Sequence, residues 1–211
     1  MSSNESCTLS KARCLRARAF VLSDFSSCSL TSIKVIYNIV CNVIDYFLLI
    51  QIMPITYIIG DATDPPRNNP GIIVHVCNDI GQWGRGFVLA VSQRWKQPEH
   101  EYRAWAKGDG PIPFELGQVQ LVQVEDNLWV ANLIGQRDIR RYQGTAPVRY
   151  EAIQQELRFV AAQAAGSGTA VHMPRIGCGL AGGTWDKIEP IVQAELADKG
   201  VPVFVYDLMS V

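Results

Sequence analysis

Two glycine-rich segments carry the clearest chemical signal in the sequence. Gly81–Gly86 follows the apolar run Ile72–Cys77, and Gly177–Gly183 follows the apolar run Thr169–Met173. Glycine lets the backbone approach a ligand closely, and successive N–H groups in such loops form concave sites for anions. A helical pattern begins directly after each loop, so the partial positive charge of a helix N-terminus adds to the attraction. We therefore expect the two loops to hold a diphosphate between them.

Neither loop matches the commoner nucleotide-binding motifs. The sequence has no GxxxxGK[ST] segment, so it lacks the lysine that holds the β- and γ-phosphates in a P-loop. The glycines of the first loop are in the wrong order for GxGxxG, and no acidic residue follows at the distance which that motif requires. Arg85 and Arg175 are the basic side chains nearest the loops. This pattern favours a diphosphate held mainly by backbone N–H groups over a triphosphate with magnesium.

Strand patterns and helical patterns alternate along the chain around these loops. Runs rich in Val, Ile and aromatic residues predict strands at Ile55–Ile59, Ile72–Cys77, Gln118–Val124, Leu128–Ile134, Thr169–Met173 and Val203–Tyr206. Apolar periodicity and end signals predict helices at Phe87–Trp95, Glu99–Ala106, Val148–Ala165 and Trp185–Lys199. Ile72–Cys77 is nearly all apolar, as a central strand is, whereas Gln118–Val124 alternates as an edge strand does. The order predicts an α/β domain with helices on both faces of a mixed sheet.

The composition divides the chain at Met53. Of the 211 residues, 48% are hydrophobic and 18% charged, which excludes a disordered or fibrous protein. The net charge of -1 implies no general attraction to nucleic acid or to anionic membranes. All 17 Gly and all 11 Pro follow Met53. We therefore expect residues 53–211 to form the globular domain and residues 1–52 to be an N-terminal extension outside it.

The N-terminal extension allows several interpretations. Residues 1–32 are Ser-rich and basic, which resembles an organellar transit peptide. Residues 33–53 place apolar side chains at helical spacing, as an amphipathic helix does, while Asn38, Asn42 and Asp45 argue against a bilayer-spanning helix. We favour Met53 as the first residue of the mature protein, since a strand pattern follows it at once. The cysteines form no CxxC pair, so we expect no zinc site and a cytoplasmic location.

Taken together, these segments resemble the macro domain, the module that binds ADP-ribose. The resemblance covers about Met53–Leu208. Its carriers are Gly60–Thr63 after the first strand, Asn78 with Gly84 and Gly86, and Pro174–Gly183. Among macro domains, His75–Gly86 is most similar to the branch related to ADP-ribose 1″-phosphate phosphatases. The resemblance implies a three-layer α/β/α fold with a mixed central sheet, and ADP-ribose or a derivative as the ligand.

The resemblance also implies roles for individual residues. Asp61 would accept a hydrogen bond from the adenine amine, the backbone of Ala62 would meet the ring, and Asn78 would face the distal ribose. Tyr206 either packs beside adenine or belongs to the core. Trp83 and Trp185 either line the ligand pocket or have a structural packing role. The further expected ligand contacts are Gly84, Gly86, Phe87, Arg175, Ile176, Gly177, Gly179, Leu180, Ala181 and Gly182.

Few side chains near the expected ligand can act as acid or base. We predict His75, Asn78 and Asp79 as the catalytic residues, because an imidazole titrates near neutral pH and a carboxylate next to Asn78 can orient water. The alternative is that His75 is a satisfied core residue and Asp79 caps the loop. The acidic residue of one hydrolase branch and the Lys–Asp pair of another are missing from the loops, which puts those two routes in doubt.

Three functions remain open at this point. The first is hydrolysis of a phosphate or similar group at the 1″ position of ADP-ribose, with the substrate's own diphosphate helping to position water. The second is an ADP-ribose-binding module without turnover, and the third is an ADP-ribosyl hydrolase acting on modified macromolecules. Binding of RNA or poly-ADP-ribose through Arg137, Arg140 and Arg141 is more remote, since these arginines fit a solvated loop. We expect a monomer without cofactor, metal, nucleic-acid or membrane partner.

Overall fold

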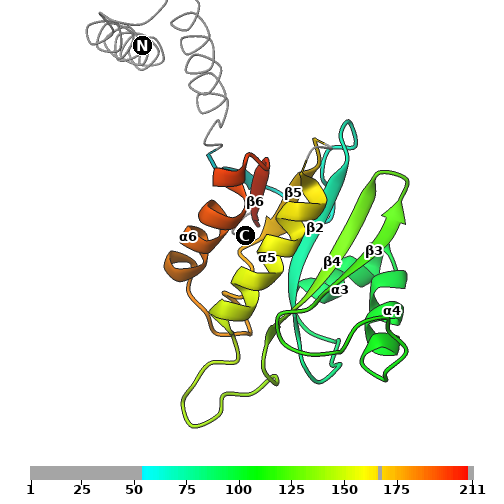
Figure 1. Cartoon of the computed structure of the whole chain (residues 1–211), viewed down its shortest axis with the longest axis vertical. Helices are drawn as coiled ribbons and strands as arrows, with labels where there is room; N and C mark the ends of the chain where they lie inside the picture. Colours follow the sequence, from blue (N-terminus) through cyan, green and yellow to red (C-terminus); the bar gives the residue numbers. More distant parts are fainter. Residues whose placement is uncertain (1–53, 166–167, 209–211) are drawn as a thin grey trace, which may run out of the picture. The chain divides into compact units, whose positions relative to one another are not determined.

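The computed structural model describes residues 54–165 and 168–208, so the interpretations of residues 1–53 lie outside the described residues. Strands and helices follow one another in the predicted order. With the labels of Figure 1, the elements are β1 (Thr56–Ile59), β2 (Gly71–Asn78), α3 (Phe87–Arg94), α4 (Gln97–Trp105), β3 (Val119–Glu125), β4 (Leu128–Gln136), α5 (Tyr150–Ala164), β5 (Ala170–Pro174), α6 (Trp185–Glu195), the 3-10 turn η1 (Ala197–Lys199) and β6 (Val203–Asp207).

The strands form one mixed sheet of six in the order β1-β6-β5-β2-β4-β3. β3 pairs antiparallel with β4, and all other neighbouring strands are parallel. β2 lies inside the sheet between β5 and β4, and every one of its residues except the half-buried Val76 is buried. β3 lies at an edge, with Val119 and Val122 buried and Gln123 and Glu125 exposed. The central place of β2 agrees with its apolar run, and the edge place of β3 agrees with its mixed polar and apolar residues.

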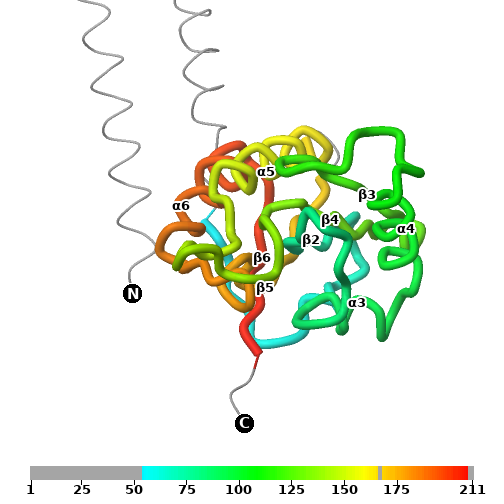
Figure 2. The backbone as a smooth tube through the Cα atoms, turned by 90° about the horizontal axis from the view of Figure 1, so that it is seen from below, coloured from blue at the N-terminus to red at the C-terminus, as the bar shows by residue number. Residues whose placement is uncertain are grey.

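Helices cover both faces of the sheet, so the fold has three layers. α5 and α6 lie on one face and α3 and α4 on the other, as Figures 1 and 2 show. Each face has its own apolar core, and β2 contributes to both because its side chains alternate. Ile72 and Val74 belong to the core under α5 and α6, whereas Ile73 and Cys77 belong to the core under α3 and α4. The predicted α/β/α architecture is confirmed.

All four predicted helices are found, with one or both ends shifted, and two of the shifts have a clear local cause. The last helix ends at Glu195 rather than Lys199, because Leu196 leaves the helical region with φ -120° and ψ -65° before η1 begins. α5 begins at Tyr150 rather than Val148, because the Val148 N–H donates to the carbonyl of Ala181 at 3.0 Å. That hydrogen bond ties the chain before α5 to the second glycine loop.

The parallel strands place the predicted chemistry at one edge of the sheet. The carboxyl ends of parallel strands meet at the same edge, where ligands bind in open α/β sheets. The first glycine loop follows β2 and the second follows β5, and these two strands are neighbours. Figure 2 views the chain from below Figure 1, onto this edge. Among the described residues, no helix is long and apolar enough to cross a bilayer, and no cluster of three metal-ligating side chains occurs.

Candidate functional site

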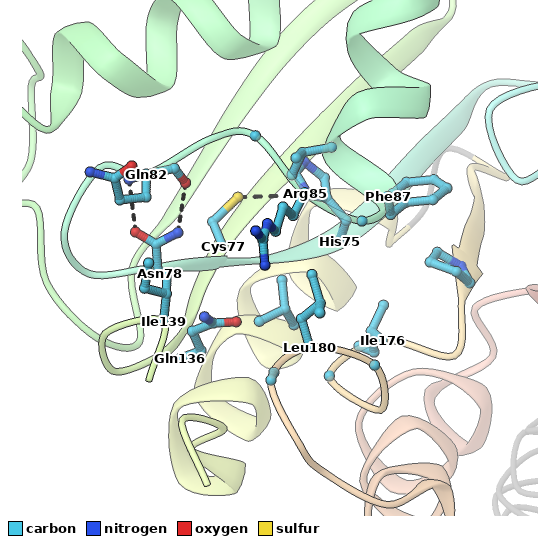
Figure 3. Close-up of a pocket in the computed structure, with 18 of the residues that line it drawn as sticks. His75, Cys77, Asn78, Gln82, Arg85, Phe87, Gln136, Ile139, Ile176 and Leu180 are labelled. Atoms are coloured by element: carbon cyan, nitrogen blue, oxygen red, sulfur yellow. Dashed lines mark hydrogen bonds between the residues drawn. The ribbon is translucent and has the colours of Figure 1, made fainter. Parts of the chain in front are cut away.

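A cleft of about 760 Å³ lies between the two glycine loops (Figure 3). Its lining comes from the end of β2, the first loop with the start of α3, the loop after β4, and the loop after β5. The predicted site residues that line it are His75, Asn78, Gly84, Gly86, Phe87, Arg175, Ile176, Gly177, Gly179, Leu180 and Ala181. The sheet topology thus gathers most of the predicted ligand contacts in one place.

The Asn78 amide shapes the first loop. Its Oδ1 accepts the N–H of Gln82 at 2.9 Å and its Nδ2 donates to the Gln82 carbonyl at 2.6 Å (Figure 3). Asn78 Oδ1 also accepts the N–H of Ile80 at 3.2 Å. The Tyr102 hydroxyl donates to the Asn78 carbonyl from α4. The loop is therefore fixed by hydrogen bonds to the side chains of Asn78 and Tyr102, and the Asn78 amide is engaged by the loop itself.

Both loops present backbone N–H groups that have no acceptor within the described residues. In the first loop and the start of α3 these are the groups of Gly84, Arg85, Gly86, Phe87 and Val88. In the second loop they are the groups of Gly179, Leu180 and Ala181. The next two N–H groups of the second loop are paired within it. Gly182 donates to the Gly179 carbonyl and Gly183 donates to the Gly177 carbonyl, both at 2.9 Å. Unpaired N–H groups from two loops around one cleft are suited to bind an anion.

Gly84 and Gly179 are glycines that the protein's own packing does not require. Both line the cleft, both have ordinary φ, and a Cβ placed on either would meet no atom of the described residues within 4 Å. By contrast, a Cβ on Gly177 would lie 2.9 Å from Ile188 Cδ1, and a Cβ on Gly183 would lie 2.7 Å from the Gly177 carbonyl oxygen. The open space beside Gly84 and Gly179 fits close approach of a ligand to the backbone.

The charge of the cleft is positive although the chain as a whole is slightly acidic. Arg85, Arg140 and Arg175 line it, and no carboxylate does so within the described part. Arg175 is neutralised by Asp207, whose oxygens accept from its Nε and Nη2 at 2.6 and 2.7 Å. The Arg175 guanidinium also lies over the rings of Tyr57 and Trp185. These contacts hold the Arg175 guanidinium in one position at the β5 side of the cleft.

His75 lines the cleft, but both nitrogens of its ring have contacts with buried side chains of the protein. Its Nε2–H donates to Asn132 Oδ1 at 2.7 Å, and the Cys77 thiol lies 3.6 Å from its Nδ1. Complete burial lowers the pKa of His75 to about 4, although the hydrogen bond to Asn132 acts in the opposite sense. The imidazole is therefore neutral at physiological pH. This geometry matches the core-residue alternative, and it gives the predicted acid or base role no support.

Asp79 is not among the residues that line the cleft. Its Oδ1 accepts the N–H of Asp138 at 2.7 Å, and its Oδ2 lies 3.9 Å from Arg137 Nε. The carboxylate thus fastens the first loop to the loop after β4. Gly182 is also absent from the lining, although the neighbouring Ala181 belongs to it.

The residues expected at adenine lie at the β1 side, outside the cleft lining. Asp61 Oδ1 accepts both the N–H and the hydroxyl of Thr63 at 2.8 Å, while Oδ2 is 3.7 Å from Arg94. Ala62 is buried. Tyr206 is buried too, and its hydroxyl lies 3.0 Å from His172 Nδ1. The proposed adenine contacts of these residues stay predictions.

The two loop tryptophans take the packing role rather than lining the cleft. Trp83 is buried, and its Nε1–H donates to Ser92 Oγ at 2.8 Å. Its ring stands edge-on to His75, with centroids 5.4 Å apart. Trp185 is half-buried and donates to the Tyr57 hydroxyl at 3.0 Å. Trp83 thus anchors the first loop to the core under α3 and α4.

Several lining residues were not among the predicted contacts. They are Val76, Cys77, Gln82, Arg85, Val88, Gln136, Ile139, Arg140 and Pro174. Gln136, Ile139 and Arg140 come from the end of β4 and the loop after it. The signal that could have found them is topological, since β4 is parallel to β2 and must end at the same edge.

Comparisons with known proteins agree with this architecture. No protein-family model matches the sequence. The chain is 30% identical over 161 residues to the zebrafish protein "Chromodomain-helicase-DNA-binding protein 1-like", covering 72% of the chain and 15% of that protein. The matched part of the chain therefore spans only a small part of the length of that relative. It is 21% identical over 164 residues to the "ADP-ribose 1''-phosphate phosphatase" of Lodderomyces elongisporus, covering 74% of the chain and all of that protein.

Solved structures show a stronger likeness. A macrodomain protein of Streptomyces coelicolor is 52% identical, with a TM-score of 0.64 and coverage of 73% of this chain and 99% of that one. A protein of unknown function from Bacteroides thetaiotaomicron is also 52% identical, with a TM-score of 0.71 and coverage of 74% and 99%. A Trypanosoma brucei macrodomain in complex with ADP-ribose shares the fold at 16% identity, a TM-score of 0.51 and coverage of 74% and 64%.

Proposed function

Because the chain belongs to the macrodomain family, we propose that its cleft binds ADP-ribose or a close derivative through the diphosphate. The observation that carries the proposal is the set of unpaired N–H groups on both sides of the cleft, from Gly84–Val88 and from Gly179–Ala181. A diphosphate offers acceptor oxygens to both loops at once. The N-terminus of α3 adds a favourable field, since Gly86 is its N-cap.

The order of the strands favours one direction for the ligand. Asp61 follows β1, the two glycine loops follow β5 and β2, and Gln136 ends β4. With adenine near Asp61, the diphosphate would cross between the loops and the distal ribose would lie toward β4. Asp61 retains one carboxylate oxygen without a hydrogen bond from the described residues, and that oxygen can accept the adenine amine.

A thermal-shift comparison of the full chain tests this proposal. At a ligand concentration of about 100 times Kd, binding to the folded state adds about 2.7 kcal/mol, which corresponds to a rise in Tm of roughly 5–10 °C for a domain of this size. ADP-ribose should give this shift, and AMP, which has one phosphate, should give a much smaller one. Equal shifts with AMP and ADP-ribose would show that the diphosphate is not the recognised group.

A second candidate is hydrolysis of a phosphate at the 1″ position. The similarity to the Lodderomyces phosphatase over its whole length favours it. The cleft offers no carboxylate from the described residues, and His75 is neutral and hydrogen-bonded. Turnover would therefore depend on the substrate's own diphosphate to activate water and on N–H groups to stabilise charge. Removal of ADP-ribose from modified macromolecules would meet the same shortage of acid–base groups.

Product analysis separates turnover from binding alone. The full chain is incubated with ADP-ribose 1″-phosphate, and released inorganic phosphate is measured against a blank. Phosphate release that is lost in Gly84→Ala would support hydrolysis in this cleft. Tight binding without phosphate release would leave a binding module as the function.

A further inference from the structure

Two of the arginines that line the cleft have no carboxylate partner among the residues that the structure describes. Arg85 belongs to the first loop and Arg140 to the loop after β4, and neither forms an ion pair with any described residue. Arg175, the third lining arginine, is held by Asp207, and Arg137 is held near Asp79. The cleft therefore carries two positive charges that no carboxylate of the described residues neutralises.

The loop after β4 is fastened in a way that places Arg140 at the cleft. Asp79 binds the Asp138 N–H, and Gln136 Nε2 donates to the Asp138 carbonyl at 2.8 Å. On the other side, Arg141 packs on the second loop, since a Cβ on Gly182 would lie 3.2 Å from its Nη2. The loop is thus joined to both glycine loops, and it closes the β4 end of the cleft.

Arg85 lines the cleft from the first loop, which follows β2, the neighbour of β4 in the sheet. Figure 3 shows its side chain between the first loop and Leu180 of the second loop, among the residues that line the cleft. Arg85 and Arg140 are both exposed, so neither is required for packing. Guanidinium groups offer several N–H donors and bind phosphate oxygens in pairs.

We propose that Arg85 and Arg140 select ligands by the charge carried beyond the distal ribose, and that they bind a phosphate group at that end. The inference rests on the proposed function, because the β4 end of the cleft is the distal-ribose end when adenine lies near Asp61. The loop N–H groups already serve the diphosphate, so the two free guanidinium groups are available to a third phosphate. The same two charges oppose a cationic substituent at that position.

A series of three ligands with different charge at the 1″ position tests the inference. ADP-ribose 1″-phosphate carries a phosphate there, ADP-ribose carries a hydroxyl, and NAD carries the positively charged nicotinamide. Calorimetry with the full chain should rank affinity in that order, with steps of roughly tenfold or more at low salt. High salt should compress the series, because exposed charges are screened. Phosphorus NMR after each titration checks that the ligand is intact.

Substitution of the two arginines should remove the ranking. In Arg85→Gln with Arg140→Gln, the three affinities should converge while ADP-ribose itself still binds. Arg137→Gln is the matched control, since Arg137 lies in the same loop but is paired with Asp79 and does not line the cleft. That variant should keep the full ranking.

The outcomes separate this inference from the proposed function. Equal affinities in the wild type, or a ranking that survives in the double variant, would overturn the inference while ADP-ribose binding stands. A wild type that binds none of the three ligands would overturn both.

Discussion

Replacement of Gly84 or Gly179 by alanine gives the sharpest test of how the cleft is built. Neither residue has a positive φ, and within the described part of the chain an added Cβ meets no atom within 4 Å in either case. Alanine at such a position stabilises the fold by about 0.4–1 kcal/mol, because it reduces the freedom of the unfolded chain. The Tm of both variants should therefore equal or slightly exceed that of the wild type.

The same two methyl groups should weaken ligand binding. The methyl occupies the space beside an N–H group that we assign to the diphosphate, so at least one charge-assisted hydrogen bond is lost. Such a bond contributes about 1.5–3 kcal/mol, which corresponds to a roughly 10- to 150-fold rise in Kd for ADP-ribose. Isothermal titration calorimetry measures the affinity, and differential scanning calorimetry measures the Tm of the same samples.

Gly183→Ala is the contrasting control for a glycine that the fold needs. Its Cβ would lie 2.7 Å from the Gly177 carbonyl oxygen, so the variant should be destabilised by about 1–3 kcal/mol. If Gly84→Ala and Gly179→Ala bind ADP-ribose as tightly as the wild type does, the assignment of these glycines to ligand approach is refuted.

Three further predictions concern buried polar groups. Glu156 is fully buried without a hydrogen-bond partner for its carboxyl oxygens among the described residues, and burial raises its pKa well above the usual value. The unfolding free energy should therefore fall as pH rises above about 4.5, by up to about 1.4 kcal/mol per pH unit. Urea titrations of the Glu156→Gln variant, run in parallel with the wild type, should lose this pH dependence. The pKa of His75 is lowered to about 4, so stability should fall as pH drops from about 6.5 toward 4, and His75→Gln should reduce that fall; an unchanged acid dependence would contradict the assignment. Asn78→Ala should weaken ADP-ribose binding by loosening the first loop, with amide exchange of Ile80 and Gln82 accelerated; unaltered exchange would argue against the loop-shaping role.

Much of the fold followed from local patterns in the sequence. The apolar run Ile72–Cys77 became the central strand β2, and the alternating run Gln118–Val124 became the edge strand β3. These patterns are reliable because burial on two faces and on one face impose different side-chain periods. The end of the last helix was less predictable, since apolar residues continue through Leu196 and Ala197 while the backbone turns away.

The candidate site was predictable where glycines mark it and less so elsewhere. Glycine loops after strands indicate the cleft, because few other sequences allow close backbone approach. The environment of His75 was not accessible from the sequence, since Asn132 is 57 residues away and meets it only across the β2–β4 register. Arg140 was not predicted to line the cleft for a similar reason. It lies in a loop, and a loop has no side-chain periodicity that would indicate which part of the fold it packs against.

In the binding mode proposed for this cleft, the N–H groups of two glycine loops bind one diphosphate. Titration of the nitrogen-15-labelled full chain with ADP-ribose, followed through the backbone amide resonances, tests this most directly. We predict saturable shifts that are largest for Gly84, Gly86, Gly179 and Ala181 and that fit a single affinity. Saturable shifts confined to other residues, or no shifts at millimolar ADP-ribose, would contradict the claim.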